Sequence, residues 1–120
     1  VPVPIHPKRK KKRGYNQVTL FGKAIASALN VPYEDQILIK TGITKTQVFK
    51  KRIARWGQLD NTLTIKDLNV LKGQHVLLVD DIITTGATIE ACGAKLLETE
   101  NLKLSVATMA ITLWHLKIDS

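Results

Sequence analysis

Cysteine, aromatic residues and long apolar runs are all scarce in this chain. Cys92 is the only cysteine among 120 residues, which excludes an intrachain disulfide or a cysteine-rich zinc cluster within this sequence and favours a reducing, cytoplasmic location. The longest nearly apolar stretch near the C-terminus, residues 106–114, is interrupted by Thr108 and Thr112. It is less than half of the roughly 20 residues that cross a bilayer as a helix. We therefore expect no membrane span.

Length and composition indicate one globular domain. Apolar residues make up 44% of the chain and charged residues 23%, which is the balance of a folded domain rather than of a disordered tail. We therefore expect a single core domain over residues 1–120. The chain opens at Val1 without a methionine or a secretory signal pattern, so we also expect further residues upstream.

The positive charge is concentrated in one segment. The formal net charge is +8, and the run KRKKKR at residues 8–13 supplies six of those charges. Such a run is often no more than a solvated surface segment, but it also suits a local anionic partner. Single-stranded nucleic acid is one candidate, because polycations gain affinity for it by releasing counterions. Aromatic stacking residues are few there, since only Tyr15 adjoins the run.

The N-terminal half contains a helix and weaker strand signals. Prolines alternate with apolar residues in VPVPIHP at residues 1–7, which indicates an edge-like extended segment. Residues 36–39 (QILI) and 62–65 (TLTI) are short strand candidates, and the polar stretch between them is ambiguous. Helical spacing over residues 18–29 predicts one apolar face. That face is formed by Leu20, Phe21, Ala24, Ile25, Ala28 and Leu29.

The C-terminal half has the pattern of a strand, helix, strand unit. Residues 76–79 (VLLV) form a short apolar run, typical of a strand buried on both faces of a parallel sheet. A helix is expected from about Ala87, and residues 104–111 (LSVATMAI) predict a second buried strand. We expect an α/β fold with a mainly parallel β-sheet flanked by helices. The helix should direct inward Ile89, Cys92, Leu96 and Leu97.

The residues that follow the strand at 76–79 are suited to a phosphate group. In open parallel sheets, ligands bind beyond the carboxyl ends of the strands. Thr84, Thr85 and Thr88 offer hydroxyl groups, Gly86 allows a sharp turn, and the following helix directs its N-terminal amides to the same place. The carboxylates of Asp80 and Asp81 could hold neighbouring sugar hydroxyls or a hydrated Mg²⁺ ion.

Two other interpretations of these residues are weaker, and so is metal binding by histidine. Acids at the end of a strand also occur in receiver domains, but we find no second strand that ends in a phosphorylatable Asp. A nucleotide P-loop needs glycines at both ends and a lysine, whereas Gly86 stands alone. His6, His75 and His115 lack the spacing of metal ligands, and no metal ligand is assigned.

The segment VLLVDDIITTGAT at residues 76–88 resembles the phosphoribosyl pyrophosphate (PRPP) motif of type I phosphoribosyltransferases. The resemblance implies the type I phosphoribosyltransferase fold. It also implies that Asp80 and Asp81, the residues we assign to catalysis, hold the ribose 2′- and 3′-hydroxyls. The 5′-phosphate would be held by Ile83, Thr84, Thr85, Gly86, Ala87 and Thr88.

Further motifs resemble the ComF family of competence-related, phosphoribosyltransferase-like proteins. These are VPVP at residues 1–4, RGYNQ at residues 13–17, and a TQ pair followed by Arg55 and Trp56 in the variable loop. Gln58 stands where that family usually has Asn. The resemblance implies Mg²⁺-dependent transfer of ribose 5-phosphate from PRPP to a nitrogen acceptor, with release of pyrophosphate.

In that reaction the basic run would meet the pyrophosphate through Lys8, Arg9, Lys12 and Arg13. Arg55 on the flexible loop either closes over the substrate or pairs with a surface acid. Two other functions stay open. One is a non-catalytic module in DNA uptake, which binds single-stranded DNA or competence proteins, and the other is a regulatory PRPP sensor. Binding to a polycation would weaken steeply as salt rises, whereas a PRPP site should depend on Mg²⁺ and on Asp80 and Asp81.

Overall fold

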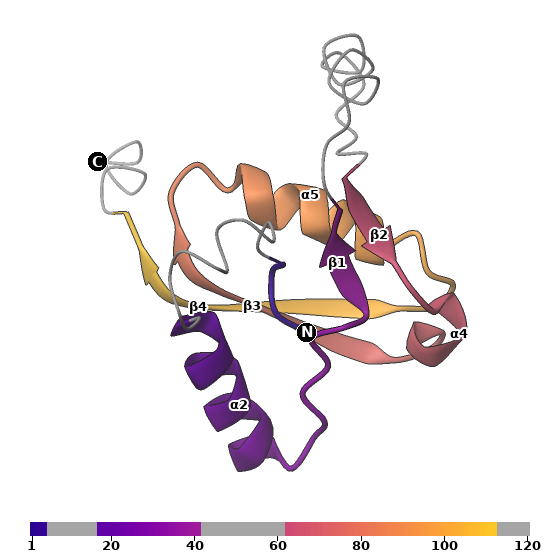
Figure 1. The fold of residues 1–120 in the computed structure, drawn as a ribbon, viewed down its shortest axis with the longest axis horizontal. Coiled ribbons are helices and arrows are strands. Elements are labelled where there is room, and N and C mark those ends of the chain that lie inside the picture. The colour runs from indigo at the N-terminus through magenta and orange to yellow at the C-terminus, as the bar shows by residue number, and fades with distance from the viewer. Residues whose placement is uncertain (5–16, 42–61, 113–120) are drawn as a thin grey trace, which may run out of the picture.

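The computed structural model describes residues 1–4, 17–41 and 62–112. The elements follow one another along the chain as shown in Figure 1. They are α2 (Gln17–Leu29), β1 (Leu38–Lys40), β2 (Leu63–Ile65), α4 (Leu68–Leu71), β3 (His75–Ile83), α5 (Ala87–Leu96) and β4 (Lys103–Ile111). Several predicted residues lie outside the described ranges. These are Lys8, Arg9, Lys12, Arg13 and Arg55, with the rest of the motifs at residues 13–16 and 46–58.

β3 has a parallel neighbour on each of its edges. On one edge it pairs with β4, with Val76 opposite Leu104. On the other edge, the Val79 amide donates to the Val1 carbonyl at 2.9 Å and the Val3 amide donates to the Val79 carbonyl at 2.8 Å. Pro2, which lies opposite Val79, directs its nitrogen away from β3 and loses no ladder bond. The predicted edge-like extended segment is therefore confirmed for its described part.

The predicted strand, helix, strand unit is present as β3, α5 and β4, with the two strands parallel. The predicted end of the first strand was wrong. β3 runs on to Ile83, because Asp80, Ile82 and Ile83 still pair with β4. The acidic pair therefore lies inside the carboxyl end of the strand rather than in a loop after it.

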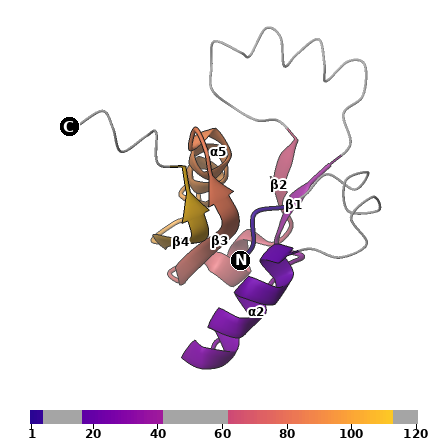
Figure 2. The same ribbon diagram turned by 90° about the vertical axis from the view of Figure 1, so that its left-hand side faces the viewer.

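The core lies on the α5 side of β3. Leu78 of β3 and Leu96 of α5 have no exposed surface, and Cys92 is 1% exposed. The antiparallel hairpin of β1 and β2 adds Leu38 and Leu63 to the same cluster. Figures 1 and 2 show α5 and α2 on opposite sides of β3 and β4. The described part is thus an α/β arrangement with helices on both faces of a parallel strand pair.

The helix α2 is where the spacing placed it, but its predicted apolar face was only partly right. Phe21 and Ile25 are half-buried, whereas Leu20, Ala24, Ala28 and Leu29 are exposed. Leu20 and Leu29 are 67% and 59% exposed, while Val18 and Ala26 are buried. Gly22 explains the choice of face, because a Cβ atom there would lie 2.5 Å from Tyr33 Cε2 and 3.2 Å from Val79 Cγ2. Gly22 faces the sheet because, without a side chain, it lets the helix backbone approach the sheet closely.

Three smaller expectations also need correction. The first hairpin strand is Leu38–Lys40 rather than residues 36–39, and it pairs antiparallel with β2. Leu97 follows the end of α5 and is 55% exposed. β4 is not fully buried, since Val106, Met109 and Ile111 are 43%, 56% and 45% exposed. Among the described strands only β3 pairs with β4, so its far edge is uncovered by them.

Candidate functional site

Asp80 and Asp81 are half-buried at the carboxyl end of β3. The Asp81 amide donates to Asp80 Oδ1 at 2.8 Å, and the Ile82 amide donates to Asp81 Oδ1 at 2.8 Å. The pairing of β3 with β4 includes Asp80 and Ile82 but skips Asp81. Each carboxylate is therefore held through one oxygen against the local backbone, which fixes both acids side by side.

The pKa of Asp80 is raised to about 6, mainly because burial disfavours the charged carboxylate. A hydrogen bond with the Asp81 side chain and the negative charge of Asp81 raise the pKa further, while the Asp81 backbone amide opposes them. The charged form of this half-buried carboxylate is therefore unfavourable in the empty protein. Hydroxyl donors of a bound sugar would favour the charged form of such a carboxylate.

Gly86 forms the corner between β3 and α5. Its φ of +84° is in the left-handed region, which non-glycine residues adopt only with strain. The Gly86 carbonyl accepts the first intrahelical bond from the Glu90 amide at 2.9 Å, and the Ala87 amide donates to Thr85 Oγ1 at 3.2 Å. Thr84, Thr85 and Thr88 are exposed. The segment thus combines three exposed threonines with the start of a ten-residue helix.

Thr112 anchors this corner from the neighbouring strand, and the sequence motif did not identify it. Its amide donates to the Ile83 carbonyl at 3.1 Å, and its hydroxyl donates to the Thr84 carbonyl at 3.3 Å. The parallel register carries this contact, since Ile83 lies opposite Ile111. The register itself could not be read from the motif.

The structure places the predicted residues 80, 81 and 83–88 in one continuous path from the end of β3 to the start of α5. Their contacts with a sugar phosphate stay predictions. Whether the basic run meets the same site is likewise untested, because Lys8, Arg9, Lys12 and Arg13 lie outside the described residues, as does Arg55.

The acidic pair could share a Mg²⁺ ion with a phosphorylated substrate. Within residues 1–4, 17–41 and 62–112, no group of three or more His, Cys, Asp and Glu side chains could hold a metal. Mg²⁺ keeps several waters and is commonly bound through one or two carboxylates together with substrate phosphates. Asp80 and Asp81 supply that number of carboxylates, so the donor set fits an ion that arrives with its substrate.

A hollow of about 710 Å³ lies between α2 and β3, away from the acidic pair. Ile25, Val31 and Leu77 are among its mainly apolar lining residues, and neither Asp80 nor Asp81 lines it. Size alone therefore does not identify the site, because the acids and hydroxyls lie at the carboxyl end of β3.

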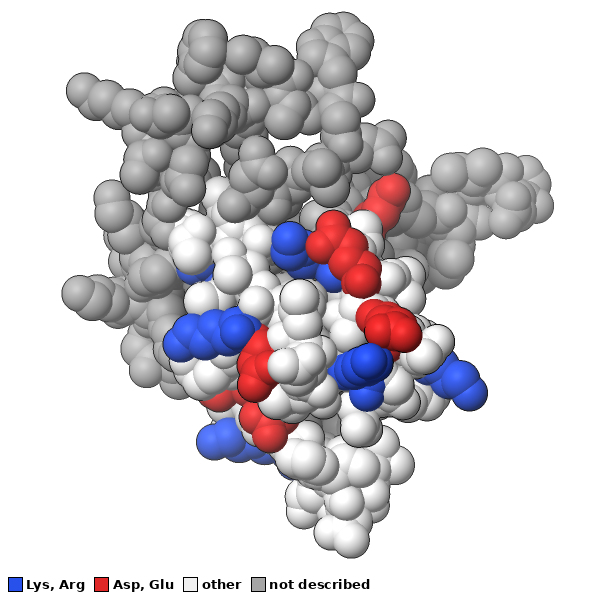
Figure 3. Space-filling model, turned by 90° about the vertical axis from the view of Figure 1, so that its right-hand side faces the viewer, with Lys and Arg blue, Asp and Glu red and all other residues white. Residues whose placement is uncertain are grey.

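The described surface in Figure 3 carries mixed charge. Lys side chains are interspersed there with Asp and Glu side chains, and ion pairs join Lys72 to Glu100 at 3.2 Å and Lys95 to Glu98 at 3.4 Å. Such a surface produces no strong field of one sign. The described residues contain six lysines and eight acids, so the excess positive charge of the chain comes from residues 8–13 and from residues 42–61.

Comparisons with known proteins agree with this arrangement. The sequence matches the phosphoribosyl transferase domain family over residues 19–114. The chain belongs to this family and has an α/β fold of the type I phosphoribosyltransferase kind. Within it, the chain is a member of the ComF family.

The curated relatives carry names connected with DNA. The chain is 30% identical to the DNA utilization protein YhgH of Escherichia coli over 97% of this chain and 47% of that protein. It is 33% identical to competence protein F of Haemophilus influenzae over 74% of this chain and 39% of that protein. It is 32% identical to competence protein ComFC of Bacillus subtilis over 82% of this chain and 38% of that protein. The chain thus spans about half the length of the first of these relatives and less than half of the other two.

No solved structure matches the chain significantly. As to membranes, none of the helices in the described ranges is long and apolar enough to pass through a bilayer.

Proposed function

We propose that this chain binds PRPP and transfers its ribose 5-phosphate group to a nitrogen nucleophile, with release of pyrophosphate. The observation that carries the proposal is the continuous path from Asp80 and Asp81 through Gly86 into the start of α5. Its carboxylates can accept hydrogen bonds from the hydroxyls of a sugar, and its threonine hydroxyls and backbone amides can donate hydrogen bonds to a phosphate. Membership of the phosphoribosyl transferase domain family supports the same reaction class.

In this proposal the protein works mainly by positioning. Asp80 and Asp81 accept hydrogen bonds from the ribose 2′- and 3′-hydroxyls, and residues 83–88 hold the 5′-phosphate. The C1′–oxygen bond to pyrophosphate breaks while the nitrogen–C1′ bond forms, and the nitrogen then releases its proton. Fixing both ends of the sugar removes most of its rotational freedom before reaction. Bound Mg²⁺ would neutralise the negative charge that gathers on the pyrophosphate.

The basic run has a matching role in this proposal. Lys8, Arg9, Lys12 and Arg13 follow the extended segment at residues 1–4, whose Val3 is bonded to Val79 immediately before Asp80. Val3 therefore lies beside the residue that precedes the acidic pair. The cations that follow in the sequence would stabilise the departing pyrophosphate.

Calorimetric titration of PRPP, with and without Mg²⁺, tests the binding step. We expect saturable binding that requires Mg²⁺ and is lost in the double variant Asp80→Asn, Asp81→Asn. Asp35→Asn is the matched control, because Asp35 is an exposed acid outside this path. Absence of PRPP binding by folded wild-type protein would rule out the enzymatic proposal for this chain.

A second candidate is a non-catalytic module that acts in DNA uptake. The names of the relatives, DNA utilization protein and competence protein, favour it, and so does the run of six cations at residues 8–13. In this case single-stranded DNA binds mainly through its phosphates, and the affinity falls steeply as salt rises.

Oligonucleotide binding separates the two candidates. If the DNA module is correct, changing Lys8, Arg9, Lys12 and Arg13 to Ala abolishes the salt-dependent binding of single-stranded DNA, while the acidic-pair variant retains it. If the enzyme is correct, the acidic-pair variant loses PRPP. A protein that binds PRPP without turnover on any amine or base would act as a sensor.

A further inference from the structure

The hollow of about 710 Å³ between α2 and β3 has no role in the proposed function. Its lining includes the buried side chains of Val76 and Val79. Its rim is apolar as well, since Leu29, Val31 and Val70 line it and are 59%, 50% and 49% exposed. Single exposed apolar side chains are ordinary, but several of them around one hollow are typical of an interaction surface.

The strand beside the hollow has no free edge for an extended peptide. β3 pairs with β4 along one edge. On its other edge the Val1 amino group donates to the Leu77 carbonyl at 3.0 Å, and the Val3 amide donates to the Val79 carbonyl at 2.8 Å. A helix satisfies its own backbone groups and needs only an apolar groove for its apolar face. The hollow therefore suits a helix better than an added strand.

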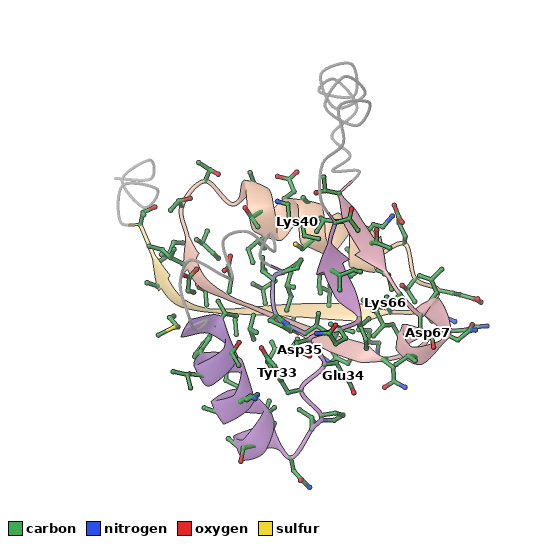
Figure 4. All side chains as sticks on the ribbon, viewed as in Figure 1. Tyr33, Glu34, Asp35, Lys40, Lys66 and Asp67 are labelled. Carbon is green, nitrogen blue, oxygen red and sulfur yellow. The ribbon has the colours of Figure 1, made fainter. Side chains whose placement is uncertain are left out.

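Three acids lie around this hollow. Glu34 lines it, and Asp35 follows in the segment between α2 and β1. Asp67 caps α4, which contributes to the lining. The hairpin brings Asp67 toward Asp35, because the Lys66 amide donates to the Ile37 carbonyl at 2.9 Å. Figure 4 labels the three acids, and all of them are exposed.

Fewer positive charges accompany these acids. Lys66 is exposed and directly precedes Asp67. Burial lowers the pKa of the Val1 amino group, and the nearby charge of Glu34 opposes that shift. No lysine of the described residues lines the hollow itself. A partner that carries positive charges beside an apolar face would therefore be complementary to this surface.

We propose that the hollow between α2 and β3 is a docking site for a basic amphipathic helix of a partner protein. The apolar face of that helix would cover the exposed rim, and its lysine or arginine side chains would lie opposite Glu34 and Asp35. This surface is separate from the proposed PRPP site, because neither Asp80 nor Asp81 lines the hollow. The inference therefore does not depend on the proposed function.

Three synthetic peptides test the docking site by chemical-shift mapping of the ¹⁵N-labelled protein. Each has about 18 residues, which is long enough to form a helix. The first has leucines along one helical face and lysines on the other. The second has glutamates in place of the lysines, and the third has the composition of the first with its leucines scattered around the helix.

We expect the first peptide to bind saturably, with the largest changes at the amides of Ile25, Val31 and Val70, which all line the hollow. The second and third peptides should bind about tenfold more weakly. The difference between the first and second should shrink as salt rises, because salt screens exposed charges.

One pair of variants tests the apolar rim. Val31→Ser removes an exposed apolar side chain and should weaken the first peptide about fivefold. Val106→Ser is the matched control, since Val106 is 43% exposed on β4 and does not line the hollow. The control should bind as wild type does. A thermal unfolding scan of each variant establishes that it is folded.

A second pair tests the acids. Glu34→Gln combined with Asp35→Asn should weaken the first peptide about threefold to tenfold at low salt. Glu90→Gln combined with Glu98→Gln is the control, because these exposed acids belong to α5 and the turn after it, on the opposite side of β3 from α2. This control should leave the affinity for the first peptide unchanged.

Several outcomes would overturn the inference. They are no binding of the first peptide, equal binding of all three peptides, chemical-shift changes away from the hollow, and equal losses in a variant and its control. A dimer detected by light scattering, with a second copy covering the hollow, would overturn it too. None of these results bears on PRPP binding, so the PRPP titration judges the proposed function separately.

Discussion

The hydroxyl of Thr112 donates a hydrogen bond to the carbonyl oxygen of Thr84 at 3.3 Å. Thr112 follows β4, and Thr84 is the first residue after β3. The bond therefore ties the phosphate-binding turn proposed here to the neighbouring strand of the sheet. A turn that is anchored at its start keeps its donors in place before the ligand arrives, which lowers the entropy cost of binding.

Thr112→Val tests this anchoring role. The substitution keeps the shape of the side chain and removes one hydrogen bond, which contributes about 0.5–1.5 kcal/mol. We expect PRPP affinity to fall about threefold to tenfold, as measured by calorimetry. Thr108→Val is the control, because the Thr108 hydroxyl donates at 2.9 Å to Ala110 within the same strand. Equal losses of PRPP affinity in the two variants would contradict the anchoring role.

Gly86→Ala should harm both stability and binding. The φ of +84° at Gly86 strains any residue with a Cβ, at a cost of about 1–2 kcal/mol in the free energy of unfolding. Gly73 has a φ of +72° and equally open surroundings, so Gly73→Ala should lose similar stability. Only Gly86→Ala should weaken PRPP. Denaturant unfolding and PRPP titration of both variants separate the two effects, and unchanged PRPP affinity in Gly86→Ala would argue against this turn as the phosphate site.

Asp80→Asn should stabilise the empty protein in a pH-dependent way. The pKa of Asp80 is raised from 3.8 in the unfolded chain to about 6, so between these values the folded state binds more protons than the unfolded state. Stability of the wild type therefore falls as pH rises through this window. Asn keeps an oxygen that can accept the Asp81 amide and carries no charge.

The measurement is the difference in melting temperature between Asp80→Asn and wild type across pH 4 to 7.5, without ligand. The difference should grow in favour of the variant as pH rises through about 6 and then level off. A difference that is constant over the whole range would show that burial does not disfavour the charged Asp80 carboxylate.

The strand, helix, strand unit could be predicted because its signals are local. Residues 76–79 form a short apolar run, and Gly86 marks the corner before the helix. The end of β3 could not be found this way, because Asp is poorly suited to strands and only pairing with β4 reveals that Asp80 belongs to one.

The inward face of α2 depends on a contact distant in the sequence. Apolar residues occur on both sides of this helix, among them buried Val18 and exposed Leu20, so spacing alone does not choose between the faces. The close approach of Gly22 to Tyr33 and Val79 makes the choice. A periodic pattern predicts that a helix forms more reliably than it predicts which face is buried.

The candidate site likewise contains residues that the sequence motif indicated and a residue that only the fold reveals. Asp80, Asp81 and residues 83–88 are contiguous in the sequence, so one motif indicated all of them. Thr112 follows another strand and is brought to this turn only through the strand register. Side chains that join a site from a distance leave no local pattern.

Amide chemical-shift mapping of the ¹⁵N-labelled protein, titrated with PRPP and Mg²⁺, tests the central claim most directly. If the account is right, the largest changes fall on the amides of residues 83–88 and their neighbours Asp80 and Asp81, and they disappear in the Asp80→Asn, Asp81→Asn variant. Changes confined to the hollow between α2 and β3, or no changes in a folded sample, would contradict it.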